Sequence, residues 1–297
     1  MKKSAFAGTA LRIAVFYCTL AAACQGAHAQ SAIPFRLEHD TVIVVSLMAN
    51  GQGPFDFVLD TGTDTTIVDP SVARTLSLSP LYRLQLDTLG RSQSSTRSSV
   101  RSLALGAARV ENLEVLELDL ADLRKVDSHI QGIVGQNFLS HFNYVLDYRR
   151  HSIRIELESE IRDGVEGDRV PIHASNNKML IASEAKSAGN ATLDLILDSG
   201  SNSVVLFQKA ARTVDLSAQR NWLEVTSGGQ VGARVGRIKA LTVGRQRFYD
   251  LDVVLRAAET DDGELVGDGV LPTALFQSLY VNNRESFVVF NPRTKKN

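Results

Sequence analysis

The sequence is poor in cysteine, carries almost no net charge and has only one long apolar run. Its two cysteines, Cys18 and Cys24, lie close to the N-terminus. A chain without them has no disulfide, no thiol nucleophile and no cysteine-ligated metal. The 32 basic and 33 acidic residues leave a formal net charge of −1, which argues against a dedicated nucleic-acid-binding protein.

Several familiar chemistries have no motif in this chain. It lacks a Walker loop and a serine-hydrolase elbow, and its histidines form no zinc-binding pair, so we expect no metal and no other cofactor. What the chain does contain is enough apolar sequence to fold. Of its 297 residues, 44% are apolar and 22% are charged, which excludes wholesale disorder and suits two domains or lobes.

The N-terminus has the pattern of an export signal. Lys2 and Lys3 precede the apolar stretch 5–23, and Ala27–Ala29 then places small residues before a cleavage point. This order of a cationic region, an apolar region and small residues is typical of a secretory signal peptide. We therefore predict that residues 1–29 are removed and that the mature protein is periplasmic or secreted, with no membrane span.

An alternative interpretation of the same N-terminal segment is that it is a lipoprotein signal. Ala21–Ala23 followed by Cys24 resembles a degenerate lipoprotein cleavage box. A lipoprotein would be anchored to a membrane surface through Cys24 rather than released. The intact mass of the exported protein distinguishes the two outcomes.

The most informative feature is an internal repeat. The segments Phe55–Leu78 and Leu193–Leu216 align without a gap at a constant offset of 138 positions. Identical residues occupy the pairs Asp56/Asp194, Leu59/Leu197, Asp60/Asp198, Gly62/Gly200, Ala73/Ala211, Arg74/Arg212, Thr75/Thr213 and Leu78/Leu216. A second, shorter repeat lies downstream, where Gln131–Gly135 matches Asp268–Pro272. We predict two homologous halves at 31–160 and 168–297.

Each half is expected to be mostly β. Short apolar or alternating runs bounded by turn residues predict strands; in the first half they are Thr41–Met48, Asp56–Leu59, Ser102–Leu105, Leu113–Leu118, Tyr144–Asp147 and Ser152–Leu157. In the second half they are Met179–Ser183, Leu193–Leu197, Arg237–Val243, Leu251–Leu255 and Ser286–Phe290. Short helices are expected at Pro70–Leu78, Phe138–Phe142, Gln208–Leu216 and Ala274–Leu279. This balance predicts two closed β-lobes rather than βαβ units.

In both copies an apolar strand runs into Asp, then Thr or Ser, then Gly, then Thr or Ser. The strand aims the carboxylate of Asp60 or Asp198, and the glycine allows a tight turn. Two such turns related by a pseudo-two-fold axis bring the carboxyl groups face to face. The hydroxyls of Thr63 and Ser201 are then placed to donate to the outer carboxylate oxygens.

Two facing carboxyl groups cannot both ionise easily, so they share one proton. The ionised member can take a proton from a water, and the protonated member can give its proton to a carbonyl oxygen. This pattern predicts direct amide hydrolysis without a covalent intermediate. A lone Asp-Ser-Gly is usually just a turn at a strand end. Its occurrence twice in a gapless repeat favours catalysis.

These residues resemble a known family. Val58–Thr63, Ile196–Ser201 and the Ile133–Gly135 element are similar to the paired active-site motifs of retropepsin-like and pepsin-like aspartic proteases. The stretch GIVGQNFLSHFNYVLDY resembles bacterial members of this group. The resemblance covers nearly the whole mature chain and implies the acid-protease fold, with two retropepsin-like lobes in one chain.

The resemblance also implies roles for particular residues. It makes Asp60 and Asp198 the catalytic dyad, and Thr61 and Ser199 the residues that brace the dyad across the lobe interface. The turns of Gly62-Thr63 and Gly200-Ser201 complete the dyad support. The substrate it implies is an extended peptide or protein lying between the lobes of a monomer.

The second lobe departs from the family pattern at one position, and each lobe contains a candidate flap. Pro272 stands where the first half has Gly135, which departs from the family pattern in the second lobe. The candidate flaps are the turns at Leu89-Gly90 and Gly228-Gly229, which lie between strand-like runs and suit mobile lids. Ordinary hairpin turns are the alternative for both.

Two rival functions are compatible with these residues. The first is a catalytically inactive peptide-binding protein of the same fold. Residual cleavage of denatured protein at acidic pH separates it from a protease. The second is another carboxylate-pair hydrolase, such as a glycosidase, whose carboxyl groups would stand about 5–9.5 Å apart.

Overall fold

The computed structural model describes residues 32–88, 91–157, 165–185, 191–226, 229–256 and 266–294. The predicted signal peptide 1–29, including Cys24, lies outside the described residues. In the part of the chain that is described, no helix is long and apolar enough to cross a membrane.

The N-terminal lobe is built on an eight-stranded sheet. Its strand order is β2 (Arg36–Glu38), β3 (Val42–Ala49), β4 (Gln52–Leu59), β9 (Ile130–Val134), β5 (Ile67–Val68), β8 (Ala108–Glu117), β7 (Arg91–Leu105) and β6 (Pro80–Thr88). An additional pairing of β3 with β7, at Met48 and Ala104, closes the sheet on itself.

The C-terminal lobe repeats this arrangement. The strands β14 (Lys178–Ala185), β15 (Ala191–Asp198), β20 (Gly269–Pro272), β16 (Val204–Phe207), β19 (Gln246–Arg256), β18 (Gly229–Val243) and β17 (Ser217–Thr226) follow one another. A pairing between β14 and β18 closes this lobe at the same place. The predicted pair of closed β-lobes is therefore confirmed.

The two lobes match residue by residue. In the parallel pair β4–β9, Val58 lies opposite Ile133, and in β15–β20 Ile196 lies opposite Val270. The burial patterns of β3 and β14 are also identical along their whole length. The repeat seen in the sequence is thus a repeat of strand register, which places the two Asp turns at equivalent ends of equivalent strands.

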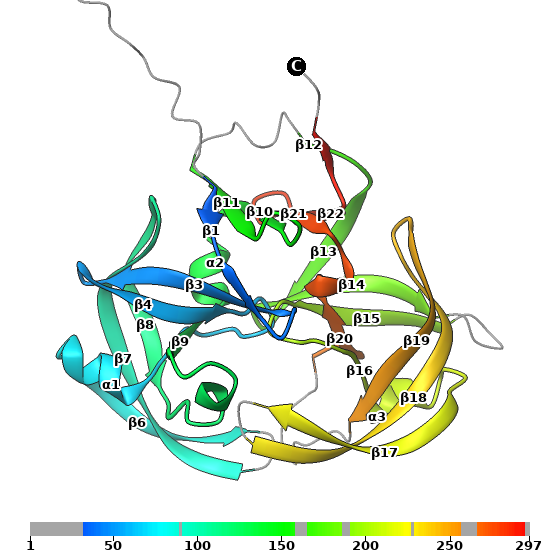
Figure 1. The fold of residues 1–297 in the computed structure, drawn as a ribbon, viewed down its shortest axis with the longest axis horizontal. Helices are drawn as coiled ribbons and strands as arrows, with labels where there is room; N and C mark the ends of the chain where they lie inside the picture. Colours follow the sequence, from blue (N-terminus) through cyan, green and yellow to red (C-terminus); the bar gives the residue numbers. More distant parts are fainter. Residues whose placement is uncertain are drawn as a thin grey trace, which may run out of the picture.

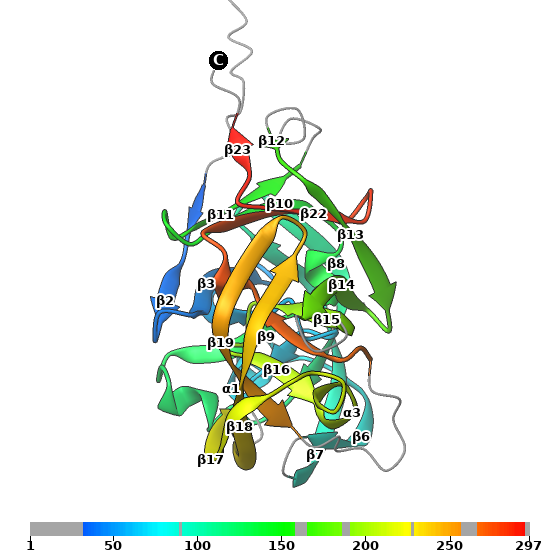
Figure 2. The same ribbon diagram turned by 90° about the vertical axis from the view of Figure 1, so that its right-hand side faces the viewer.

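A shared sheet joins the lobes. From β14 the C-terminal sheet continues through β13 (Arg169–Ser175), β22 (Phe287–Phe290), β21 (Ser278–Asn282), β10 (Asn143–Asp147), β11 (Ser152–Glu156) and β1 (Ile33–Pro34). The pairing of β10 with β21 joins the two halves, for example at Tyr144 and Val281. Figures 1 and 2 show these strands together at one end of the molecule, next to β12 (Val165–Glu166) and β23 (Arg293–Thr294). One buried apolar cluster includes Leu59 and Leu197, so the lobes share a core.

The helices are shorter than the sequence predicts. Helix α1 (Pro70–Thr75) starts at Asp69, whose side chain accepts from the Ser71 amide, and ends before Ser77, which has a positive φ. The other helices among the described residues are α2 (Gln136–Leu139), α3 (Gln208–Ala211), η1 (Leu123–Lys125) and η3 (Thr273–Leu275). The helix expected over 274–279 is wrong in its second half, because β21 begins at Ser278 and pairs with β10 and β22.

Two long hairpins were underestimated from the sequence. The pairs β6–β7 and β17–β18 reach the end of the molecule opposite the shared sheet (Figures 1 and 2). Within them the sequence predicted bounded strands only at Ser102–Leu105 and Arg237–Val243, and the adjoining part of β7, Arg91–Arg101, is almost entirely polar and gives no apolar alternation. Their pairing with neighbouring strands supplies the order that local sequence does not indicate.

Candidate functional site

Each Asp turn follows a strand that lies between two neighbouring strands of its sheet. Asp60 follows β4, and its amide donates to the carbonyl oxygen of Val134 at 3.0 Å. Asp198 ends β15 and lies opposite Pro272 of β20. Because both strands are held between neighbours on either side, each carboxyl group is presented from a rigid part of its lobe.

The turns interlock through Thr61 and Ser199. The Thr61 hydroxyl donates to the carbonyl oxygen of Leu197 at 2.8 Å, and the Ser199 hydroxyl donates to that of Leu59 at 2.7 Å. Each hydroxyl also accepts from the other residue's amide, at 3.0 and 2.9 Å. Both side chains are buried. Four reciprocal hydrogen bonds therefore fix the turns across the pseudo-two-fold axis, as the resemblance implied.

Glycine is required after each of these residues by close approach. A Cβ placed on Gly62 would lie 2.4 Å from Cγ of Asp198, and one on Gly200 would lie 2.7 Å from Cγ of Asp60. Each glycine thus backs onto the carboxyl group of the opposite lobe. The structure brings Asp60 and Asp198 close enough for a hydrogen bond between their side chains.

The hydrogen bonds to the two carboxyl groups are unequal. Asp60 accepts from the amides of Gly62 and Thr63 at 2.8 and 3.0 Å, and from the Thr63 hydroxyl at 2.7 Å. Asp198 accepts from the Gly200 amide at 2.7 Å. The expectation for Ser201 is wrong, since its hydroxyl donates to the backbone oxygen of Ser203 at 3.0 Å instead of to a carboxylate.

Burial and the neighbouring charge determine the protonation of this pair. Burial, followed by the charge of Asp60, raises the pKa of Asp198 well above the ordinary aspartate value. The Gly200 amide and the charge of Lys178 lower this pKa but do not offset the rise. The raised pKa of Asp198 favours its protonated form, and Asp60 is the carboxyl group that accepts the larger number of hydrogen bonds from its own turn.

Lys178 is a functional candidate that sequence reasoning missed. It begins β14, and its Nζ donates across the lobe interface to the backbone oxygen of Gly62 at 2.5 Å. The equivalent position in the N-terminal lobe, the start of β3, is Val42. The alignment of these two strands was the available signal, but the gapless repeat does not extend to them.

A second missed contact connects the shared sheet to the site. The Tyr148 hydroxyl lies 2.5 Å from Oγ1 of Thr273, which follows Pro272 directly and is fully buried. Burial raises the pKa of Tyr148, and the charge of nearby Asp198 adds to the rise. Tyr148 therefore stays protonated and lies near enough to Asp198 to feel its charge.

Pro272 is accommodated by a matching change next to it. In the N-terminal lobe the Gly135 amide donates to the Thr66 hydroxyl at 3.3 Å. In the C-terminal lobe the proline has no amide hydrogen, and Val204 takes the first place of β16 without a hydroxyl. Donor and acceptor are thus both replaced, so no buried polar group loses its partner through this pair of changes.

Of the predicted flap residues, Leu89, Gly90 and Gly228 lie outside the described residues. Gly229 is described and begins β18, where it lies opposite Thr226 of β17. The strands that flank these positions in the sequence form the hairpins β6–β7 and β17–β18, which occupy equivalent places in the two lobes.

Comparison with known proteins identifies a protein family whose sequence pattern matches both lobes. A family model described as aspartyl protease matches residues 45–138 and again residues 183–273. The two matches fall on the two lobes, and each includes one Asp turn. No curated protein has a significantly similar sequence. With both halves of its length matched by the same model, the chain belongs to the aspartyl protease family.

Proposed function

We propose that this protein is an exported aspartic endopeptidase that hydrolyses peptide bonds with a water activated between Asp60 and Asp198. The observation that carries the proposal is the interlocked pair of Asp turns, in which two carboxyl groups face each other within hydrogen-bonding reach. The family match supports a protease-like function in general.

The unequal surroundings of the carboxyl groups suggest which one takes which role. We assign the proton-donating role to Asp198, whose pKa is raised, and the role of base to Asp60, which accepts three hydrogen bonds from its own turn. A water gives a proton to Asp60 as its oxygen bonds to the peptide carbonyl carbon, while Asp198 donates its proton to the carbonyl oxygen. The resulting diol then collapses. The C–N bond breaks, the leaving nitrogen takes the proton from Asp60, and a diol hydroxyl returns a proton to Asp198.

The substrate we propose is an extended polypeptide held between the lobes. Both halves of the site come from one chain, so a monomer is sufficient for activity. The hairpins β6–β7 and β17–β18 are placed symmetrically in the two lobes and suit a role as lids over that substrate.

The geometry disfavours the glycosidase alternative. Such enzymes separate their two carboxyl groups by at least about 5 Å, to leave room for a sugar carbon or a water. Here each turn glycine packs directly against the opposite carboxyl group, and Asp60 lies close enough to Asp198 for its charge to raise the pKa of Asp198. An inactive peptide-binding protein of the same fold is the alternative that activity measurements must address.

Cleavage of a denatured protein at acidic pH tests the proposal. We expect the purified mature chain to cut it, and Asp60→Asn and Asp198→Asn each to abolish cutting with an unchanged circular dichroism spectrum. The double variant should be no worse than either single one, since one shared proton needs both groups. An active Asp198→Asn enzyme would contradict the two-lobed mechanism, and an inactive wild-type chain would favour the peptide-binding alternative.

Export is tested separately by the intact mass of the protein recovered from the host envelope or medium. A chain that begins at Gln30 would support the signal peptide. A chain that begins at Cys24 and carries acyl groups would show a lipoprotein instead.

A further inference from the structure

An arginine-lined pocket lies in the C-terminal lobe, away from the Asp turns. It has a volume of about 1120 Å³ and lies between α3 and the strands β17, β18 and β19. Its lining consists of Gln208, Ala211, Arg212, Leu216, Gln219, Asn221, Gly232, Ala233, Arg234, Leu255 and Arg256. Neither aspartate of the candidate site contributes to it.

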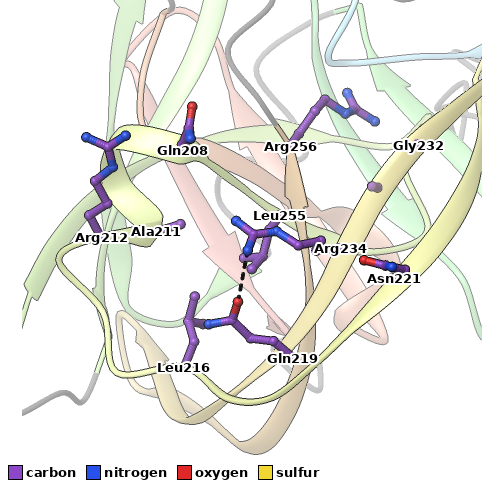
Figure 3. A pocket seen from close by; sticks show the side chains of 11 residues that line it. Gln208, Ala211, Arg212, Leu216, Gln219, Asn221, Gly232, Arg234, Leu255 and Arg256 are labelled. Carbon is purple, nitrogen blue, oxygen red and sulfur yellow. Dashed lines mark hydrogen bonds between the residues drawn. The ribbon is translucent and has the colours of Figure 1, made fainter.

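The pocket has a clear chemical character. Its three arginines come from three different segments, at the end of α3, on β18 and at the end of β19. Figure 3 shows Arg234 projecting across the hollow toward Gln219, which accepts its hydrogen bond at 3.3 Å, with Arg212 on one side and Arg256 on the other. No carboxylate is among the described residues that line the pocket, and Arg212 and Arg234 supply positive charge to it.

The N-terminal lobe provides an internal comparison. Arg234 lies opposite Leu255 in β18–β19, and in the equivalent pair β7–β8 Thr96 lies opposite Glu117. The N-terminal lobe thus has a neutral residue in place of the arginine and an acid in place of the leucine. Since both lobes close in the same register, the fold itself does not require an arginine at position 234.

The lining favours a polypeptide segment over a small anion. The pocket is larger than the about 300–1,000 Å³ of typical small-molecule sites. Arginine guanidinium groups bind carboxylates through paired hydrogen bonds, while the amides of Gln208, Gln219 and Asn221 match the donors and acceptors of a peptide backbone. Leu216 and Leu255 add apolar surface for side-chain stems.

We propose that this pocket binds an acidic segment of a polypeptide, with Arg212 and Arg234 clamping its carboxylates, and that it serves as a secondary recognition site for protein substrates. The second part rests on the proposed protease function, whereas binding of the acidic segment does not. Because residues of both β17 and β18 line the pocket, a bound segment is held against one of the two candidate lids.

Binding is measured first on the Asp60→Asn chain, which keeps the pocket and removes cleavage. The probes are a fluorescein-labelled Asp/Glu-rich peptide and a Lys-rich peptide of equal length. We expect the acidic peptide to bind, and to bind more weakly at about 0.3 M than at about 0.05 M salt, because charge attraction is screened. Replacing Arg212 and Arg234 together by Gln should weaken binding at least about tenfold.

The matched control replaces Arg74 and Arg101, two exposed arginines of the N-terminal lobe, by Gln. Arg74 is the repeat equivalent of Arg212 and lies on the equivalent helix, and the control pair removes the same charge as the Arg212/Arg234 pair. The control should bind the acidic peptide like the parent chain. Equal losses in both double variants, equal binding of the Lys-rich peptide, or tighter binding to phosphatidylglycerol vesicles than to the acidic peptide would each overturn the proposal.

The recognition role is then tested with the active chain and a cleavable peptide, with and without an acidic extension. We expect the extension to lower KM about tenfold at unchanged kcat, and the Arg212/Arg234 double variant to lose this advantage while cutting the plain peptide normally. If neither peptide is cut but the acidic one still binds, the protease function fails and the binding site stands. If both are cut with equal KM, the recognition role is wrong.

Discussion

The contact between each turn glycine and the opposite carboxyl group can be tested by adding one methyl group. In Gly62→Ala the new Cβ would start 2.4 Å from Cγ of Asp198, whereas ordinary contacts of a Cβ lie at 3.4–4 Å. The two groups must therefore separate by about 1 Å, and a displacement of that size at a reacting centre costs about 10²-fold in rate. We expect kcat/KM to fall at least that far, equivalent to about 2.7 kcal/mol of transition-state stabilisation. Gly200→Ala should have a similar effect, since its Cβ would start 2.7 Å from Cγ of Asp60.

The assay is kcat/KM on a fluorogenic peptide chosen from the cleavage products of a denatured protein, with thermal unfolding measured in parallel. Gly236→Ala is the control, because its Cβ would meet its nearest neighbours at 3.5 Å or more. This variant should retain full activity. A folded Gly62→Ala enzyme with undiminished kcat/KM would refute the reasoning, since catalysis would then not depend on the close approach of the carboxyl groups.

Three further predictions concern the charges of the site. Asp198→Asn should stabilise the fold relative to the parent at neutral pH, and less so at about pH 4, as urea unfolding at both pH values can measure. The reason is that the pKa of Asp198 is raised in the folded parent, so the parent loses stability as the pH rises above the ordinary aspartate value of about 3.9. Lys178→Met should move the alkaline limb of the activity profile to higher pH, because the Lys178 charge lowers the pKa of Asp198; Lys209→Met on α3 should leave it in place. Thr63→Ala should lower kcat/KM about tenfold, whereas Ser201→Ala should not, since only the Thr63 hydroxyl reaches a carboxylate; the two enzymes are compared on one peptide.

The sequence was sufficient for the features that local pattern encodes. An apolar strand followed by Asp-Thr-Gly defines its own turn, and finding it twice at one offset predicted the two lobes. The partner of Thr61 was also accessible, because pseudo-symmetry pairs it with Ser199. These inferences needed no knowledge of how distant segments pack.

Other features depend on distant contacts that no local pattern reports. Lys178 and Gly62 are separated by 116 positions, and Tyr148 and Thr273 by 125. The different hydrogen bonds of Thr63 and Ser201 are invisible in the aligned motifs, since both residues offer a hydroxyl. The strand at Ser278 was mistaken for helix because its pairing with β10 comes from the other half of the chain.

The exchange of a glycine and threonine for Pro272 and Val204 also bears on how this chain finds its fold. In two halves with the same register, a strand of one half can pair wrongly with the partner of its equivalent in the other half, and such repeats are prone to misassembly. If β20 docked beside β5 in place of β9, Thr66 would face a proline where Gly135 donates a hydrogen bond in the native lobe. If β9 docked beside β16, the Gly135 amide would meet Val204 and lose its acceptor. Each wrong pairing would leave a polar group without its native partner, so the departure from symmetry beside the aspartates disfavours pairing a strand of one half with the equivalent neighbour in the other.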